Sequence, residues 1–194
     1  MNYRLATPTD IPGLLSLQQR YLVTNLSAEA QKNGFVTTPF SEKQVMDLIK
    51  LQGIYVAIYE NELIAYLCAG AWDYFSQWPI FPYMVNRLRH LSFLRQSLAG
   101  VNTFQYGPVC IDETWRGQGV LQHLFEVMRQ DFSSKYPISI TFINKVNKRS
   151  INAHLDKLHW KIIDEFIFNE RHYYLLAFDM SYKVLEDTGL KTTS

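Results

Sequence analysis

The spacing of apolar residues alternates between a helical and a strand-like period along the chain, and it predicts the order of the elements. Apolar residues recur at helical intervals over 11–22, which predicts a helix there. A second helix is predicted from Ser41, because Ser41 and Gln44 form a capping-box pattern, and Gly53 ends it. The strongest helical pattern covers 120–132, where one face is apolar and the other polar.

Apolar runs rich in β-branched and aromatic residues predict the strands. They cover 3–6, 54–59, 63–72, 104–111, 137–143, 160–168 and 172–180. The second and third strands are separated by a short polar turn, so they are expected to be antiparallel neighbours. A further helix is predicted over 148–158. This order predicts an α+β fold of the three-layer α/β type, in which helices pack on a mixed sheet.

We expect a single domain over 1–183 and a tail over 184–194. An aromatic-rich insertion over 72–100 interrupts the strand pattern. A helix is predicted in its second half, with Met84 and Leu98 at the two ends of one apolar side. The aromatic residues of the insertion can form a substrate pocket or a local core, and a local core is the default interpretation because aromatic side chains mostly pack.

Charge and composition narrow the function classes. Lys plus Arg number 19 and Asp plus Glu 18, so nucleic acid is not expected as the main partner, since phosphate binding needs surplus basic side chains. The N-terminus lacks a secretory pattern and no apolar stretch reaches the ~18 residues of a membrane span. We therefore expect a cytoplasmic protein without a membrane partner. Cys68 and Cys110 are expected to be buried, reduced thiols, and no metal site is expected.

The segment from Arg116 to Gly119 carries the clearest chemistry, because it joins a predicted strand to the strongest predicted helix. The first turn of a helix has backbone N–H groups without internal partners, and the helix dipole adds positive charge there. Glycines let these groups approach a ligand closely, so the segment predicts a phosphate-binding loop. It lacks the Gly-Lys-Ser/Thr of nucleotide hydrolases and the third glycine of the dinucleotide fingerprint.

This segment resembles the coenzyme-A loop of the GNAT superfamily of N-acetyltransferases. That motif reads Arg or Gln, two residues, Gly, one residue, then Gly or Ala. Arg116 and Gly119 match it, whereas Leu121 departs from it at the last position and is expected to crowd the phosphate site slightly. The order of predicted elements also agrees with the family, and the insertion over 72–100 fits least well.

A second motif lies downstream at the family's usual distance. The segment from Asn147 is similar to the family's Asn-x-Arg-Ser helix that ends in Gly-Phe, with His159 and Trp160 in place of that pair. The resemblance implies a mostly antiparallel central sheet of about seven strands. It also implies that the two strands flanking the loop splay apart to admit the pantetheine arm. Asn147 can contact the pantetheine, cap the helix that follows, or do both.

The resemblance implies acetyl-CoA as cosubstrate and direct attack of a primary amine on the thioester. The acceptor would be a small molecule or a peptide, and a homodimer is left open. The residues that the resemblance assigns to the cofactor are Val109, Cys110, Ile111, Arg116, Gly117, Gln118, Gly119, Val120, Leu121, Asn147 and Ser150.

Two residues are candidates for proton transfer. Tyr106 is the only titratable residue over 101–108, where the family often has a carboxylate base. His154 stands where the family often has a tyrosine that protonates the thiolate, and a histidine suits proton transfer at neutral pH, although a surface histidine is the alternative. Asp112 and Glu113 are interpreted as solvated carboxylates, which leaves a water relay or Asp73 as further candidates for the base. Tyr173 and Tyr174 are alternative proton donors.

Two other functions remain open. The chain can be a non-catalytic acyl-CoA-binding module that has kept the loop and lost the proton-transfer groups. It can also be an interaction protein that docks a partner on the aromatic insertion.

Overall fold

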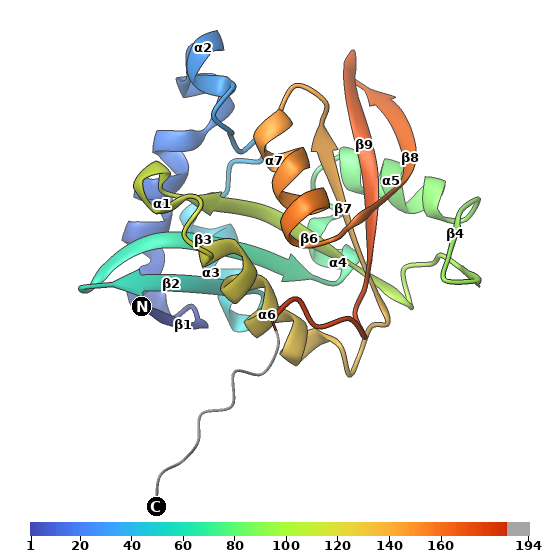
Figure 1. The fold of residues 1–194 in the computed structure, drawn as a ribbon, viewed down its shortest axis with the longest axis horizontal. Helices are drawn as coiled ribbons and strands as arrows, with labels where there is room; N and C mark the ends of the chain where they lie inside the picture. Colours follow the sequence, from blue (N-terminus) through green and yellow to red (C-terminus); the bar gives the residue numbers. More distant parts are fainter. Residues whose placement is uncertain (186–194) are drawn as a thin grey trace, which may run out of the picture.

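The computed structural model describes residues 1–185, which form one seven-stranded sheet with helices on both faces (Figure 1). The strand order is β1-β2-β3-β6-β7-β9-β8, and every neighbouring pair is antiparallel except β6 and β7. The predicted mixed, mostly antiparallel sheet is therefore confirmed. The strands are β1 (Asn2–Leu5), β2 (Ile54–Tyr59), β3 (Glu62–Gly70), β6 (Thr103–Ile111), β7 (Ile138–Asn144), β8 (Lys161–Phe168) and β9 (Arg171–Asp179).

The helices divide into two layers, each with its own hydrophobic core. Leu14, Val45 and Phe81 belong to the core on one face of the sheet, and Leu124 and Phe125 to the core on the other. The first layer holds α1 (Ile11–Tyr21), α3 (Glu42–Lys50), α4 (Trp72–Phe75) and α5 (Ile80–Leu88), and the second holds α6 (Val120–Phe132) and α7 (Lys148–Asn152). A short α2 (Ala28–Gln31) follows α1.

The insertion differs from its predicted form. The predicted helix through Leu98 is wrong, because α5 ends at Leu88 and a small hairpin follows, formed by β4 (Ser92–Phe93) and β5 (Gln96–Ser97). Leu94 and Arg95 take positive φ of 52° and 62° at its turn, a conformation that cannot continue a helix. Leu98 is buried even so, because the hairpin folds back onto the core. Apolar spacing alone could not distinguish these two ways of burying it.

Most of the aromatic cluster is core, as the default interpretation holds. Phe75 and Phe81 are fully buried, and their rings pack 5.0 Å apart. Trp72 is also buried and donates from Nε1 to the Thr103 hydroxyl at 3.0 Å. The insertion is therefore held to the sheet by packing and by a buried hydrogen bond.

The parallel pairing of β6 and β7 is short, and this opens the centre of the sheet. It comprises three register pairs, the last of which joins Gln105 to Ile140. Beyond that point β6 has a bulge, where Gly107 and Pro108 together stand opposite Cys68 of β3. Gly107 has a φ of +100°, and Pro108 has no N–H to donate to a neighbouring strand. The two strands therefore separate, as the family resemblance implies.

Further expectations concern the cysteines, the tail, metal binding and membrane spans. Both cysteines are buried and free, as predicted. Val184 N–H donates to Glu126 Oε2 at 3.1 Å, while residues 186–194 of the predicted tail lie outside the described residues. Within residues 1–185 there is no group of three His, Cys, Asp or Glu that could hold a metal ion. The same residues include no helix with the length and apolar character that crossing a membrane requires.

Candidate active site

The loop before α6 borders a cavity of about 390 Å³, which we call the loop cavity. It lies between the end of β6, the first turn of α6, the helix α7 and the segment 33–36. Every predicted cofactor-binding residue except Gln118 lines it. The side chain of Gln118 turns back instead, and its Nε2 donates to the Thr114 carbonyl oxygen at 2.7 Å. Two motifs far apart in the sequence therefore meet at one cavity.

Glycine backbone shapes the part of the loop cavity next to α6. Gly117 and Gly119 have φ of +83° and +82°, a conformation that costs glycine little, and Gly119 is the N-cap of α6. A Cβ on Gly117 would meet no atom within 4 Å, so this position faces open space. In the described part of the chain, the amides of Gly117, Gln118 and Gly119 have no hydrogen-bond acceptor. They are therefore available to an anion.

Arg116 is held in place by the walls of the loop cavity. Its Nε donates to the Ile111 carbonyl oxygen at 2.8 Å, and its Nη1 donates to the Asn33 carbonyl oxygen at 2.5 Å. The guanidinium lies 4.5 Å from the centre of the Tyr21 ring. Burial lowers the pKa of Arg116, but an arginine retains its charge. Among residues 1–185, no acceptor contacts Nη2, so one side of the fork is left for a ligand.

Asn147 positions the start of α7. Its Oδ1 accepts from the Ser150 N–H at 3.2 Å, which confirms the predicted cap, and its Nδ2 donates to the Phe35 carbonyl oxygen at 3.1 Å. The helix α7 then widens into a π-helical turn, Ala153–Lys157, which replaces the regular helix predicted to 158. Such turns shift side chains relative to a regular helix and are frequent at functional sites.

His154 lies in this π-helical turn and is buried, so the surface alternative is wrong. Its Nδ1 lies 2.7 Å from the Ser150 carbonyl oxygen, which can only accept, so Nδ1 carries the proton. Burial lowers the pKa of His154 to about 4, so the ring is neutral near pH 7. Its Nε2 is then a lone-pair acceptor, not a donor.

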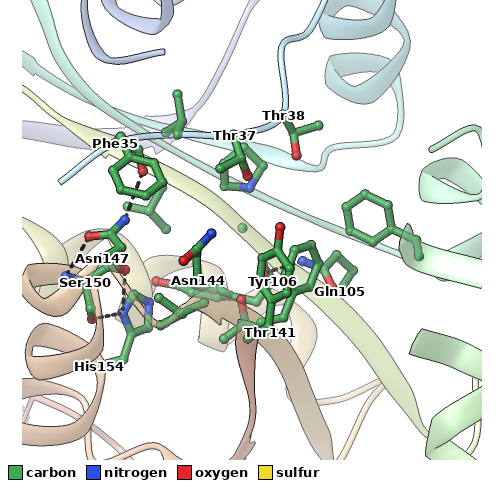
Figure 2. A pocket seen from close by; sticks show the side chains of 18 residues that line it. Phe35, Thr37, Thr38, Gln105, Tyr106, Thr141, Asn144, Asn147, Ser150 and His154 are labelled. Atoms are coloured by element: carbon green, nitrogen blue, oxygen red, sulfur yellow. Dashed lines mark hydrogen bonds between the residues drawn. The ribbon is translucent and has the colours of Figure 1, made fainter. Parts of the chain in front are cut away.

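A second cavity, of about 80 Å³, occupies the opening between β6 and β7, and we call it the gap cavity. Figure 2 shows His154, Ser150 and Asn147 on one side of it, and Phe35 and Thr37 of the segment that crosses above. It joins the loop cavity, and the residues that line both are Phe35, Val36, Val109, Asn147, Ser150 and His154. The loop cavity therefore leads into the centre of the sheet.

The polar side chains of the gap cavity include two unpaired groups. Gln105 Oε1 and the Tyr106 hydroxyl are buried and have no hydrogen-bond partner among residues 1–185. Gln105 Nε2 donates to the Tyr106 carbonyl oxygen at 2.6 Å, which fixes its amide. Burial raises the pKa of Tyr106 far above its usual value, so this hydroxyl is unsuited to act as a base at neutral pH.

Carboxylates are absent from the described lining of the gap cavity. Asp112 forms an ion pair with Arg20 at 2.6 Å. Burial alone would raise the pKa of Asp112, but hydrogen bonds from Thr114 and the charge of Arg20 hold it below its usual value. Glu113 is exposed, and Asp73 lies in α4 away from the lining. None of the three carboxylates is therefore placed to deprotonate an amine in the gap.

A third cavity, of about 420 Å³, lies beside the insertion, and we call it the aromatic cavity. Trp78, Phe168 and Tyr173 contribute to its wall, and Arg171 is the one charged residue that lines it among residues 1–185. It shares Thr37, Thr38, Phe142 and Tyr173 with the gap cavity. The three cavities thus adjoin in a row, with the gap cavity in the middle.

Comparison with known proteins finds similarity to solved structures, but no match to a family model or a curated protein. An N-acetyltransferase from Staphylococcus aureus Mu50 is 15% identical and superposes with a TM-score of 0.61 over 92% of this chain and 98% of that chain. A GNAT-family acetyltransferase from Streptococcus agalactiae 2603 is 15% identical, with a TM-score of 0.62 over 92% and 94%. This chain has the GNAT fold.

A third similar structure was solved with a ligand. It is a proposed acetyltransferase from Salmonella typhimurium, solved with its cofactor acetyl-CoA, and it is 10% identical with a TM-score of 0.62 over 92% of this chain and 93% of that chain. At such identities the likeness establishes the GNAT fold, while function has to be argued from this chain's own residues.

Several residues of the site on this GNAT fold were not predicted from sequence. The segment 33–38 lines all three cavities, yet it carries no motif. Its one local signal is Gly34, which has a φ of +100°. Gln105 lies in an apolar strand, where the pattern indicates only burial, whereas Trp78 belongs to the aromatic cluster for which a substrate pocket was one of the two interpretations. Their places at the cavities arise from the separation of the strands, which is a tertiary feature.

Proposed function

We propose that the protein is an acyl-CoA-dependent N-acyltransferase that moves an acetyl group from acetyl-CoA to a primary amine. The observation that carries this is the continuity of the loop cavity with the gap cavity. A phosphate-binding loop alone would suit many ligands. A phosphate-binding loop that leads into an opening between two strands suits a ligand with a diphosphate at one end and a slender reactive arm at the other.

The loop cavity has the charge that a phosphate-rich cosubstrate requires. The free amides of Gly117, Gln118 and Gly119 would hold the diphosphate together with Nη2 of Arg116. Arg149 and Lys157 also line the cavity, and Asp156 is the one acid among its described residues. Three cations against one carboxylate favour an anion with several phosphates.

The opening between β6 and β7 would receive the acyl arm. Bound acetyl-CoA supplies the acyl group as a thioester, which an amine can attack directly. Beyond Gln105, β6 has lost its partner β7, so main-chain groups on that edge can bond to a ligand. An N–H of Val109 or its neighbours would polarise the carbonyl group, and Asn147 stands where the arm must pass.

His154 is the proton carrier that we propose. The reaction forms a C–N bond, breaks the C–S bond, releases a proton from the amine and leaves a thiolate. Nε2 of His154 can accept the amine proton and return it to the thiolate, because His154 lines both cavities. Since the pKa of His154 is about 4, the ring would hold that proton only briefly and would relay it. This requires the acceptor amine to arrive largely neutral.

Calorimetry and thiol release test the proposal. Purified protein should bind acetyl-CoA, and release of free CoA thiol should depend on an added amine. Arg116→Glu should weaken acetyl-CoA binding by about thirtyfold or more, because it replaces a phosphate-facing cation with an anion. Arg20→Gln is the matched control, since Arg20 is an exposed arginine nearby that does not line the cavity. Equal affinities in the two variants would contradict the proposed phosphate site.

A non-catalytic acyl-CoA-binding module is the second candidate. The observation in its favour is that the described lining of the gap cavity holds no carboxylate and that Tyr106 is held protonated. This candidate expects tight acetyl-CoA binding with no amine-dependent thiol release. The interaction-protein alternative has less support, because Phe75 and Phe81 of the insertion are buried in the core.

A further inference from the structure

The aromatic cavity has mostly apolar walls and adjoins the gap cavity. Trp78 packs edge-on against Phe40, with ring centroids 5.2 Å apart and an interplanar angle of 83°. Tyr173 stacks on Phe166 at 5.1 Å. Each ring is thereby packed against a neighbouring aromatic ring, and together they offer a surface for an apolar group.

The charge that the described residues bring to the aromatic cavity is positive. Neither it nor the gap cavity has a carboxylate among the described lining residues, and Arg171 is their only charged side chain. In the described part of the chain Arg171 forms no ion pair. Glu170, the residue before Arg171, is exposed and does not line the cavity, and the acids farther along β8, Asp164 and Glu165, form ion pairs with Arg87 and Lys145. The site is therefore complementary to an anion and offers nothing to a second cation.

The register of the sheet sets the distance between Arg171 and the gap. Arg171 and Tyr173 alternate along β9 and so share one face, and Tyr173 stands opposite Asn144 of β7, with both residues lining the gap cavity. Two residues of strand span roughly 7 Å, and the opening between β7 and β6 lies roughly 7 Å across the sheet from β9. The position of Arg171 on β9 is therefore on the order of 10 Å from the opening.

We propose that the acceptor is a primary amine whose apolar body carries a carboxylate about 10 Å from the amine nitrogen. The proposal rests on the transferase function argued above. The amine would enter the gap cavity, where Gln105 Oε1 is the unpaired acceptor on the same side of the sheet. The body lies against Trp78 and Phe168, and the carboxylate meets Arg171. Polyamines and other polycations are expected to be poor substrates, because the described residues that line the aromatic cavity and the gap cavity include no carboxylate to pair with their second charge.

Three ligands of equal length separate the contributions that the amine, the apolar chain and the carboxylate make to binding. They are 8-aminooctanoate, octylamine and 1,8-diaminooctane, which share an amine and a chain but end in a carboxylate, a methyl group and an ammonium group. Calorimetry with and without CoA should give the tightest binding for 8-aminooctanoate, by about fivefold over octylamine, because Arg171 is exposed to solvent. The diamine should bind weakest. Thiol release with acetyl-CoA should follow the same order in kcat/KM.

Variants of Arg171 test whether this side chain causes the preference for a carboxylate over a methyl or an ammonium group. Arg171→Gln should abolish the preference for 8-aminooctanoate over octylamine, and Arg171→Glu should shift the preference to the diamine. Arg89→Gln is the control, since Arg89 is an exposed arginine that does not line the cavity. Far-ultraviolet circular dichroism and thermal unfolding confirm that each variant is folded.

The outcomes distinguish this proposal from the transferase function. A preference for the diamine, equal binding of all three ligands, or a preference that survives in Arg171→Gln would overturn the proposal even in an active enzyme. Failure of 8-aminooctanoate to bind would overturn it as well. Failure of acetyl-CoA to bind or react would refute the transferase, while the calorimetric ranking of the three ligands would still decide the ligand class of the cavity.

Discussion

Asn147 donates from Nδ2 to the main-chain oxygen of Phe35 at 3.1 Å, while its Oδ1 caps α7 through the N–H of Ser150. One side chain thus fixes the start of α7 and ties it to the segment 33–38. Both Asn147 and Phe35 line the loop cavity and the gap cavity, so this contact stands where the cavities meet. A ligand arm that enters the gap has to pass beside it.

Asn147→Ala should affect stability and ligand binding together. Loss of the cap and of one hydrogen bond should lower the free energy of unfolding by about 1–2 kcal/mol, as measured by urea denaturation. If Asn147 also contacts the cofactor, acetyl-CoA affinity should fall by about tenfold in calorimetry.

Ser41→Ala provides the matched control for this prediction. Ser41 caps α3 by accepting from the Gln44 N–H at 3.3 Å, and it lines none of the three cavities. Its loss should cost about 1 kcal/mol without any change in acetyl-CoA affinity. If Asn147→Ala behaved like Ser41→Ala, Asn147 would be a structural cap and nothing more.

Leu121→Ala should strengthen acetyl-CoA binding. Leu121 lines the loop cavity in the first turn of α6, at the position where the family motif has glycine or alanine. Removing its outer carbons should relieve crowding at the phosphate site, and Ala keeps the helix because its propensity is at least that of Leu. We expect affinity to rise by about threefold in calorimetry, with Gln130→Ala on the exposed part of α6 as the control. Weaker binding would show that Leu121 is a contact for the ligand.

The sequence predictions are accurate where a feature depends on interactions between residues that are close together in the chain. The helix α6 and the glycine loop are specified locally, by amphipathic spacing and by residues that accept positive φ, and both formed as predicted. The capping roles of Ser41 and Asn147 are equally local. The order of elements followed from these signals, and the sheet topology followed from the family resemblance.

The parts that the sequence did not indicate depend on distant contacts. Leu94 and Arg95 turn the chain after α5 although the apolar spacing still favours a helix. His154 is buried because a π-helical turn and the opening in the sheet place it there, and a lone histidine carries no sign of this. The segment 33–38 reaches the cavities through its contacts with Arg116 and Asn147, which no local pattern encodes.

Tyr106→Phe should leave the proposed activity within about twofold of the unsubstituted protein. The Tyr106 hydroxyl is buried without a partner among residues 1–185, and its raised pKa prevents it from acting as a base. Removing an unpaired buried hydroxyl should also keep or slightly increase stability. Steady-state thiol release and urea denaturation measure the two effects. A loss of kcat with unchanged stability would return Tyr106 to the catalytic machinery.

Stability should depend on pH through His154. Its pKa is about 4 in the folded protein and about 6.5 in the unfolded chain, so between these values the unfolded state binds a proton that the folded state does not. Stability is therefore fully present above about pH 6.5 and is lost as the pH falls towards about 4, by about 3 kcal/mol in all.

Urea denaturation at a series of pH values tests this dependence, with His154→Leu as the variant that lacks the titrating ring. The variant should show a flatter profile between about pH 6.5 and about pH 4, whatever its absolute stability. Asp10 and Asp112 give an internal reference, because their pKa values are lowered and their contributions are lost mainly at more acidic pH. Parallel profiles for the two proteins would mean that His154 titrates normally, and the proposed proton relay would then operate from a solvated ring.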